Sequence, residues 1–317
     1  MAAVAVSASL ARERRAWYMY DFGNSAYAAV VLLAVYSAYF KGTVVGGAEG
    51  SRLWGLSVGI AMLVVAVISP VLGAIADHSA YKKRFLLAFT VLACVFTALL
   101  FLVSKGDVAL GMTLFILAEI GYRGAQVFYN ALLPDIAGPE EMAAVSGRGW
   151  AVGSAGGIVC LLIILPLIML VKGPLMVRLS FVITAVFFAV SSIPLFLRLR
   201  EKGLRRSIPA GQSHLSLAFG RNWRTIKSAG QFREFLKFMA ACLVYNDGVM
   251  MAMDFAAIIG AVLFGMTQQM LIIFVIVVQV TNVAGAYAFG LLAERMSCKR
   301  ALILSIVLLI AAVLWMV

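Results

Sequence analysis

The chain has few charged residues and very few of the side chains that build metal or redox sites. Only 13% of its 317 residues are charged, whereas 63% are hydrophobic. A water-soluble domain of this length could not cover its surface with so little charge. The two histidines and four cysteines show no metal-like spacing, which argues against zinc or a disulfide framework. The composition therefore predicts an all-α integral membrane protein with no cofactor and no metal.

Acidic residues are scarce as well, with 14 Asp and Glu against 26 Lys and Arg. The net charge of +12 would suit a nucleic-acid-binding protein, but the basic residues alternate with long apolar runs, which is typical of membrane topology. Placing the N-terminus in the cytoplasm puts 20 Lys and Arg inside, five outside, and one, Arg123, within a helix. We predict a multi-pass protein of the cell (cytoplasmic) membrane with its N-terminus inside and no nucleic-acid partner.

Apolar runs of about 20 residues, the length that crosses a bilayer, occur nine times. The expected spans lie near 17–40, 53–76, 85–104, 108–133, 149–171, 175–197, 235–260, 268–293 and 301–317. A basic linker at 198–234 separates the sixth from the seventh. It is either an amphipathic helix on the inner leaflet, with Leu215 and Phe219 on its apolar face, or a disordered segment. The expected division is 1–197, 198–234 and 235–317.

A short loop after the second span recurs, altered, after the eighth. Gly73–Arg84 reads GAIADHSAYKKR, and Gly290–Arg300 reads GLLAERMSCKR. In both copies a glycine lies four residues before an acid, Asp77 or Glu294, and a basic pair begins five residues after it. An isolated copy would suit an ordinary positively charged turn, but the repetition at matched positions indicates duplicated halves.

Polar side chains within the apolar spans predict a wet cavity or internal pairs, because ionisable groups in hydrocarbon are costly. In the fourth span, polar residues recur at i, i+4, i+7 and i+11 and share one stripe: Glu119, Arg123, Gln126 and Asn130. The stripe either serves a solute or proton, or holds a structural pair that locks this helix to a neighbour. Further candidates are Tyr20, Asp21 and Asn24 in the first span and Asn246, Asp247 and Asp254 in the seventh. Asp21 could instead reach water at the cytoplasmic end.

Small residues are concentrated in the fifth span. Gly149, Gly153 and Gly157 recur every fourth residue. This spacing lets a neighbouring helix approach closely, so we expect the three glycines to form a packing surface.

The loop at Gly73 resembles the signature loop of the major facilitator superfamily of transporters, although Ala80 stands where a glycine is usual. Arg123 and Gln126 resemble that superfamily's fourth-helix motif. Four stretches together resemble its vacuole-effluxer branch: WYMYDFGNSAY at 17–27, FYNALLPDI at 128–136, SGRGWAVGSAGG at 146–157 and YNDGV at 245–249. The resemblance implies two six-helix halves, so about nine of an expected twelve helices would be present. It also implies a central cavity lined by the first, fourth and seventh helices.

We expect a secondary active transporter that moves a small polar solute by alternating access and is proton-coupled. The resemblance implies amino-acid export, the activity associated with the fungal members of that branch. From their chemistry and position we take Glu119, Asp21 and Asp247 as coupling candidates, and Arg123 as a partner for a carboxylate or a group that tunes Glu119. The ten residues expected to form a cytoplasmic gate are Gly73, Asp77, Lys82, Lys83, Arg84, Arg148, Gly290, Glu294, Lys299 and Arg300.

Two alternatives from other classes stay open. One is a truncated, inactive or regulatory remnant of a transporter, which the reading frame beyond Val317 would distinguish from a functional transporter. The other is a membrane-embedded enzyme that uses Ser154 as a nucleophile. Such a serine needs a base within reach, and His78 and His214 both lie in predicted cytoplasmic loops, so we expect no enzyme and no catalytic residues.

Overall fold

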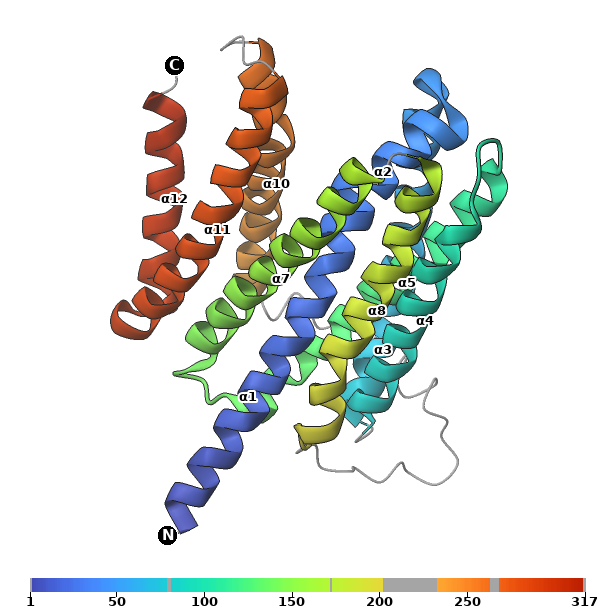
Figure 1. The fold of residues 1–317 in the computed structure, drawn as a ribbon. Helices are drawn as coiled ribbons and strands as arrows, with labels where there is room; N and C mark the ends of the chain where they lie inside the picture. The colour runs from blue at the N-terminus through green and yellow to red at the C-terminus, as the bar shows by residue number, and fades with distance from the viewer. Residues whose placement is uncertain (1, 79–80, 172, 202–232, 263–267, 316–317) are drawn as a thin grey trace. The chain divides into compact units, whose positions relative to one another are not determined.

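The computed structural model describes residues 2–78, 81–171, 173–201, 233–262 and 268–315. Within these ranges the regular structure is entirely helical and contains no strand (Figure 1). This confirms the predicted all-α class. It follows from the long apolar runs, because a helix satisfies all of its backbone hydrogen bonds within one segment.

The first span begins as α1 (Ala2–Tyr27) and continues through the π-helical segment η1 (Ala28–Ala34), α2 (Tyr36–Tyr39) and the π-helical segment η2 (Phe40–Val45). The helices that follow are α3 (Gly47–His78), α4 (Lys82–Leu99) with the 3₁₀ turn η3 (Leu100–Leu102), α5 (Val108–Ala131), α6 (Leu133–Ile136), α7 (Met142–Leu170), α8 (Pro174–Arg198), α10 (Arg233–Val262), α11 (Gln268–Met296) and α12 (Cys298–Trp315). Seven of the described helical segments are long and apolar enough to cross a bilayer. The helices α10 and α11 coincide with the two remaining predicted spans.

The chain forms two compact units. The first combines Met1–Ser207 with Val283–Val317, and the second is Ile208–Asn282. The second unit contains α10 and the first part of α11, whereas the last part of α11 and α12 belong to the first. The predicted linker helix falls largely on 202–232, outside the described residues. The division at 198–234 therefore stays a prediction.

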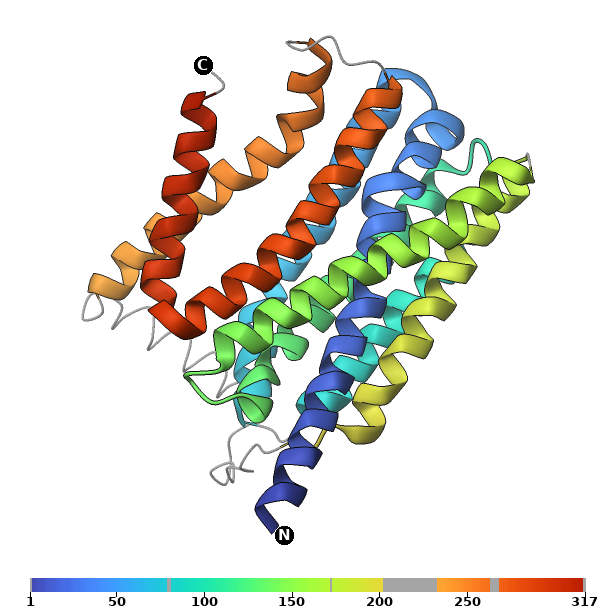
Figure 2. The ribbon, with the colours of Figure 1, turned by 60° about the vertical axis from the view of Figure 1, so that its left-hand side comes forward.

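In the first unit, α1 lies between α7 and α8, and α4 packs on both α5 and α8 (Figures 1 and 2). Aromatic rings fill the space between these helices. Trp17 and Tyr20 stack on Tyr129 of α5 at centroid distances of 4.3 and 5.1 Å, and Tyr27 stacks on Tyr122 at 4.6 Å. Such offset ring pairs add to the stabilisation from area burial. The α1–α5 contact is thus largely aromatic.

Glycines of α7 allow it to lie directly against α1. A Cβ atom on Gly156 would lie 2.6 Å from the backbone carbonyl carbon of Phe22, and one on Gly157 would lie 3.2 Å from the backbone oxygen of Ser25. A Cβ on Gly149 would overlap the Trp17 ring. The predicted packing role of the α7 glycines is therefore confirmed, and Gly156 extends it.

Candidate functional site

The polar stripe of α5 runs from the interior of the first unit to its surface. Glu119 is fully buried, and Arg123, whose side chain is 31% exposed, donates from Nε to Glu119 Oε1 over 2.8 Å. Gln126 is half-buried, and Asn130 is exposed. The predicted Glu119–Arg123 pair therefore forms within one helix, one turn apart.

Polar side chains of α1 lie against the α5 stripe and against α7. Asp21 is half-buried beside α7, where a Cβ on Gly153 would lie 2.7 Å from its Cγ atom. The Asn24 side chain hydrogen bonds to Asp21, and Tyr27 lies beside Glu119. The carboxylate of Asp21 thus lies at a contact between two helices.

Three buried oxygen atoms near this contact make no hydrogen bond of normal geometry among the described residues, although the Tyr27 hydroxyl lies close enough to the Glu119 carboxylate to interact with it. They are Asn24 Oδ1, Tyr27 Oη and Glu119 Oε2, and their residues are 2%, 0% and 0% exposed. Buried polar atoms usually find a partner, because leaving one unpaired costs about 1–3 kcal/mol. The geometry therefore suits a site that a polar molecule or a proton completes.

Two aromatic residues of this site, Tyr27 and Tyr122, were not among the predicted site residues. Besides stacking on Tyr27, Tyr122 lies 5.2 Å below the Arg123 guanidinium and beside Gln126. The signal was present in the sequence, since Tyr27 follows Asn24 by three residues and Tyr122 precedes Arg123. We call Asp21, Asn24, Tyr27, Glu119, Tyr122, Arg123 and Gln126 the α1–α5 polar site.

Tyr20 lies elsewhere. Its buried hydroxyl hydrogen bonds to Thr90 Oγ1 of α4 over 2.8 Å, and its ring contacts Tyr129 and Phe188. These contacts assign it to the packing between α1, α4, α5 and α8.

The predicted residues of the seventh span lie in the second unit. Asn246 and Asp247 are exposed on α10. Asp254 belongs to the same helix, and its side chain lies outside the described residues. Their assignment to a site stays a prediction.

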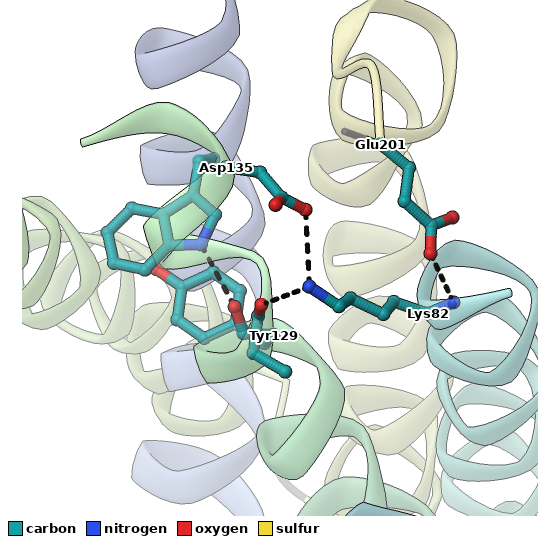
Figure 3. Close-up of polar contacts among 6 residues, drawn as sticks. Lys82, Tyr129, Asp135 and Glu201 are labelled. Atoms are coloured by element: carbon teal, nitrogen blue, oxygen red, sulfur yellow. Dashed lines mark hydrogen bonds and ion pairs between the residues drawn. The ribbon is translucent and has the colours of Figure 1, made fainter. Parts of the chain in front are cut away.

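Two of the predicted gate lysines join helix ends within the first unit, and Figure 3 shows the contacts of the first, Lys82. Lys82 Nζ donates to the Ala131 carbonyl over 3.0 Å and pairs with Asp135 at 3.4 Å, while its backbone N–H donates to Glu201 over 2.7 Å. Lys83 Nζ donates to the carbonyls of Phe196 and Leu199 at the end of α8. A cation at a helix C-terminus stabilises its unpaired carbonyls. These lysines therefore hold α4, α5 and α8 together.

The contact most like a gate joins α7 and α11. Arg148 lies 3.9 Å from Glu294, the residue that the sequence repeat aligns with Asp77. One turn from Glu294, Gly290 is buried, and a Cβ on it would lie 3.3 Å from the Gly147 Cα atom. The helices thus touch through glycines beside an ion pair.

Among the side chains that the structure describes, the other predicted gate residues take no part in that contact. The Arg84 guanidinium lies 4.8 Å above the Tyr81 ring, and Lys299 and Arg300 are exposed where α12 begins. Gly73 has open space beside it, and the side chain of Asp77 lies outside the described residues.

One ion pair, between α1 and the segment just before α7, was not predicted. Arg14 of α1 donates from Nε to the Ile136 carbonyl over 2.9 Å and pairs through Nη2 with Glu141, just before α7. The hydrogen bond and the charge of Arg14 lower the pKa of Glu141. Within the described residues, no cluster of His, Cys, Asp or Glu side chains has the arrangement of a metal site.

The chain is similar to one protein family and to several known proteins. A family model described as "Vacuole effluxer Atg22 like" matches residues 54–143 and 140–317. The "Uncharacterized MFS-type transporter YxiO" of Bacillus subtilis is 30% identical over 309 residues, which cover 94% of this chain and 71% of that protein. "Autophagy-related protein 22" of Coccidioides immitis is 22% identical over 302 residues, and the chain spans 50% of its length. An uncharacterised Aquifex aeolicus protein is 28% identical over 147 residues, which cover 46% of this chain and 36% of that protein.

Proposed function

Because the chain belongs to the Atg22-like family of vacuole effluxers, multi-pass transporters with the major facilitator fold, we propose that it exports a small polar solute by proton-coupled alternating access. We propose an amino acid as the solute and the bacterial cell membrane as the location, with the N-terminus in the cytoplasm.

The observation that carries the proposal is the pair of buried acceptors in the α1–α5 polar site: Asn24 Oδ1, which has no partner among the described residues, and the Glu119 carboxylate, which the Tyr27 hydroxyl adjoins. A solute ammonium group is a donor of the kind that these acceptors lack. The Arg123 guanidinium is partly exposed and can bind a carboxylate through two parallel hydrogen bonds. An amino acid carries both groups, which is why the site favours this class of solute.

The Glu119–Arg123 pair supports proton coupling. While Glu119 is ionised, its Oε1 atom holds the Arg123 guanidinium, and its second oxygen can accept from the solute ammonium group. A proton on Glu119 neutralises this carboxylate, so protonation would weaken solute binding. Solute and proton would then compete for the site, as export in exchange for an entering proton requires.

The contact of Arg148 with Glu294 would act as a gate. It lies on two helices that touch through Gly147 and Gly290. Opening that contact would cost the attraction between partly exposed charges, which is about 1 kcal/mol or less. A cost of this size suits a reversible switch between two orientations.

Reconstitution into liposomes tests the proposal. Purified protein would be inserted into liposomes loaded with a mixture of the proteinogenic amino acids, and release of each would be followed by mass spectrometry with and without a pH gradient. We expect gradient-dependent release of one or a few amino acids. If release of every amino acid equals that from loaded liposomes without the protein, the proposal is contradicted.

A further inference from the structure

A basic cavity of about 410 Å³ lies where the beginning of α1 meets the end of α8. The cavity is lined by Ser9, Arg12, Leu197, Arg198 and Arg200. Three of these five side chains are guanidinium groups, and they come from two chain segments far apart in sequence. The cavity lies apart from the α1–α5 polar site and from the Arg148–Glu294 contact.

Two acidic residues, Glu13 and Glu201, adjoin lining residues in the sequence. Glu201 accepts a hydrogen bond from the Lys82 backbone, and both Glu201 and the buried Glu13 act on Lys83. Neither glutamate lines the cavity. Guanidinium groups bind phosphate oxygens through paired hydrogen bonds, so the lining suits a phosphate group.

An apolar stripe leads along α8 to the same cavity. Large side chains recur at i, i+4, i+7 and i+11 with exposed fractions of 49–78%: Val186, Val190, Ile193 and Leu197. This spacing places them on one face of the helix. Leu197 belongs to both the stripe and the cavity. A soluble anion would use only the arginines, whereas a lipid would use the arginines and the stripe.

We propose that this cavity binds the phosphate of an anionic glycerophospholipid, whose acyl chains lie along the outward stripe of α8. The site would anchor the beginning of α1 to the membrane surface through the lipid. Basic pockets between membrane helices bind anionic lipid headgroups for the same electrostatic reason.

Native mass spectrometry of the purified full chain in a neutral detergent tests the proposal. Dioleoyl-phosphatidylglycerol would be titrated against dioleoyl-phosphatidylcholine, for the wild type and for Arg12→Gln, Arg198→Gln and Arg15→Gln. Arg15 is the matched control, because it is exposed on the same helix and does not line the cavity. We expect preference for phosphatidylglycerol, weakened about tenfold by Arg12→Gln or Arg198→Gln and unchanged by Arg15→Gln.

Three results would overturn the proposal. Equal weakening by all three substitutions would indicate general attraction to basic charge. Equal affinity for the two lipids would remove the role of net charge. Displacement of phosphatidylglycerol by inorganic phosphate at similar concentration would identify a soluble-anion site. Circular dichroism of each variant without added lipid verifies that it folds, so that weaker binding reports on the cavity.

Discussion

Two tyrosines of α1 show how the same side chain serves different roles seven residues apart. The Tyr20 hydroxyl is paired with Thr90, whereas the equally buried Tyr27 hydroxyl adjoins the Glu119 carboxylate without a hydrogen bond of normal geometry. Both belong to the motif WYMYDFGNSAY. The sequence predicted polar character here, but the distinction depends on α4 and α5, which no local pattern reveals.

These tyrosines give a matched pair of substitutions. Tyr27→Phe removes a hydroxyl that adjoins Glu119 without a hydrogen bond of normal geometry, so we expect little change in stability and roughly tenfold weaker solute affinity. Tyr20→Phe breaks a buried hydrogen bond, so we expect a loss of about 1 kcal/mol of stability and unchanged affinity. Thermal unfolding and solute-dependence of flux measure the two quantities. If Tyr27→Phe lowers stability and leaves affinity intact, the hydroxyl has only a structural role.

A second prediction at the residue scale concerns Glu141, whose pKa Arg14 lowers. The folded state therefore favours the ionised carboxylate. The resulting stabilisation is complete above the ordinary carboxyl pKa of about 4.3 and is lost as pH falls through the lowered pKa of the folded protein. The effect is small because Glu141 is exposed.

Melting temperatures of the wild type and Glu141→Gln, compared from neutral to acidic pH, check this. We expect the wild type to melt higher at neutral pH and the difference to shrink as the carboxylate is protonated. Glu140→Gln is the control, because the described contacts of this exposed neighbour include no ion pair. A difference that stays constant down to acidic pH would contradict the assignment.

At the scale of elements, the α1–α7 contact depends on the absence of side chains. Gly156→Ala would place a Cβ 2.6 Å from the backbone carbonyl carbon of Phe22, which cannot move without shifting α1. We expect a loss of about 1–3 kcal/mol, as for other overpacked sites. Gly59→Ala is the control, since no described atom lies within 4 Å of its Cβ position. Unfolding in denaturing detergent measures both, and equal stability of the two variants would refute tight α1–α7 packing.

The positions of the helices along the chain were predictable from the sequence, whereas contacts between residues far apart in the sequence were not. The nine predicted spans correspond to long helices because apolar length and backbone pairing decide that outcome locally. The i, i+4 spacing of Glu119 and Arg123 likewise predicted their pair. The partner of Arg148 lies on α11, far away in sequence. Only the folded chain reveals that this partner is Glu294.

At the scale of the whole molecule, the gate proposal predicts a charge-reversal rescue. Arg148→Glu or Glu294→Arg alone would change the balance of orientations, and about 1 kcal/mol shifts a two-state ratio about fivefold. We expect each to alter the flux rate by that factor, and the double variant to return towards wild type. Arg52→Glu is the control, because Arg52 pairs with Glu49 inside α3. If the flux rate of the double variant shows the combined effects of the two single substitutions, with no return towards wild type, the gate proposal is contradicted.

The central claim is that the α1–α5 polar site couples solute movement to protons through Glu119. The most direct test compares amino-acid release from liposomes containing wild type, Glu119→Gln and the control Thr113→Val, whose exposed side chain binds only its own helix backbone in the described structure. We predict that Glu119→Gln abolishes the response to a pH gradient and lowers release at least about tenfold, while Thr113→Val behaves as wild type. Gradient-dependent release that survives Glu119→Gln unchanged would contradict the claim.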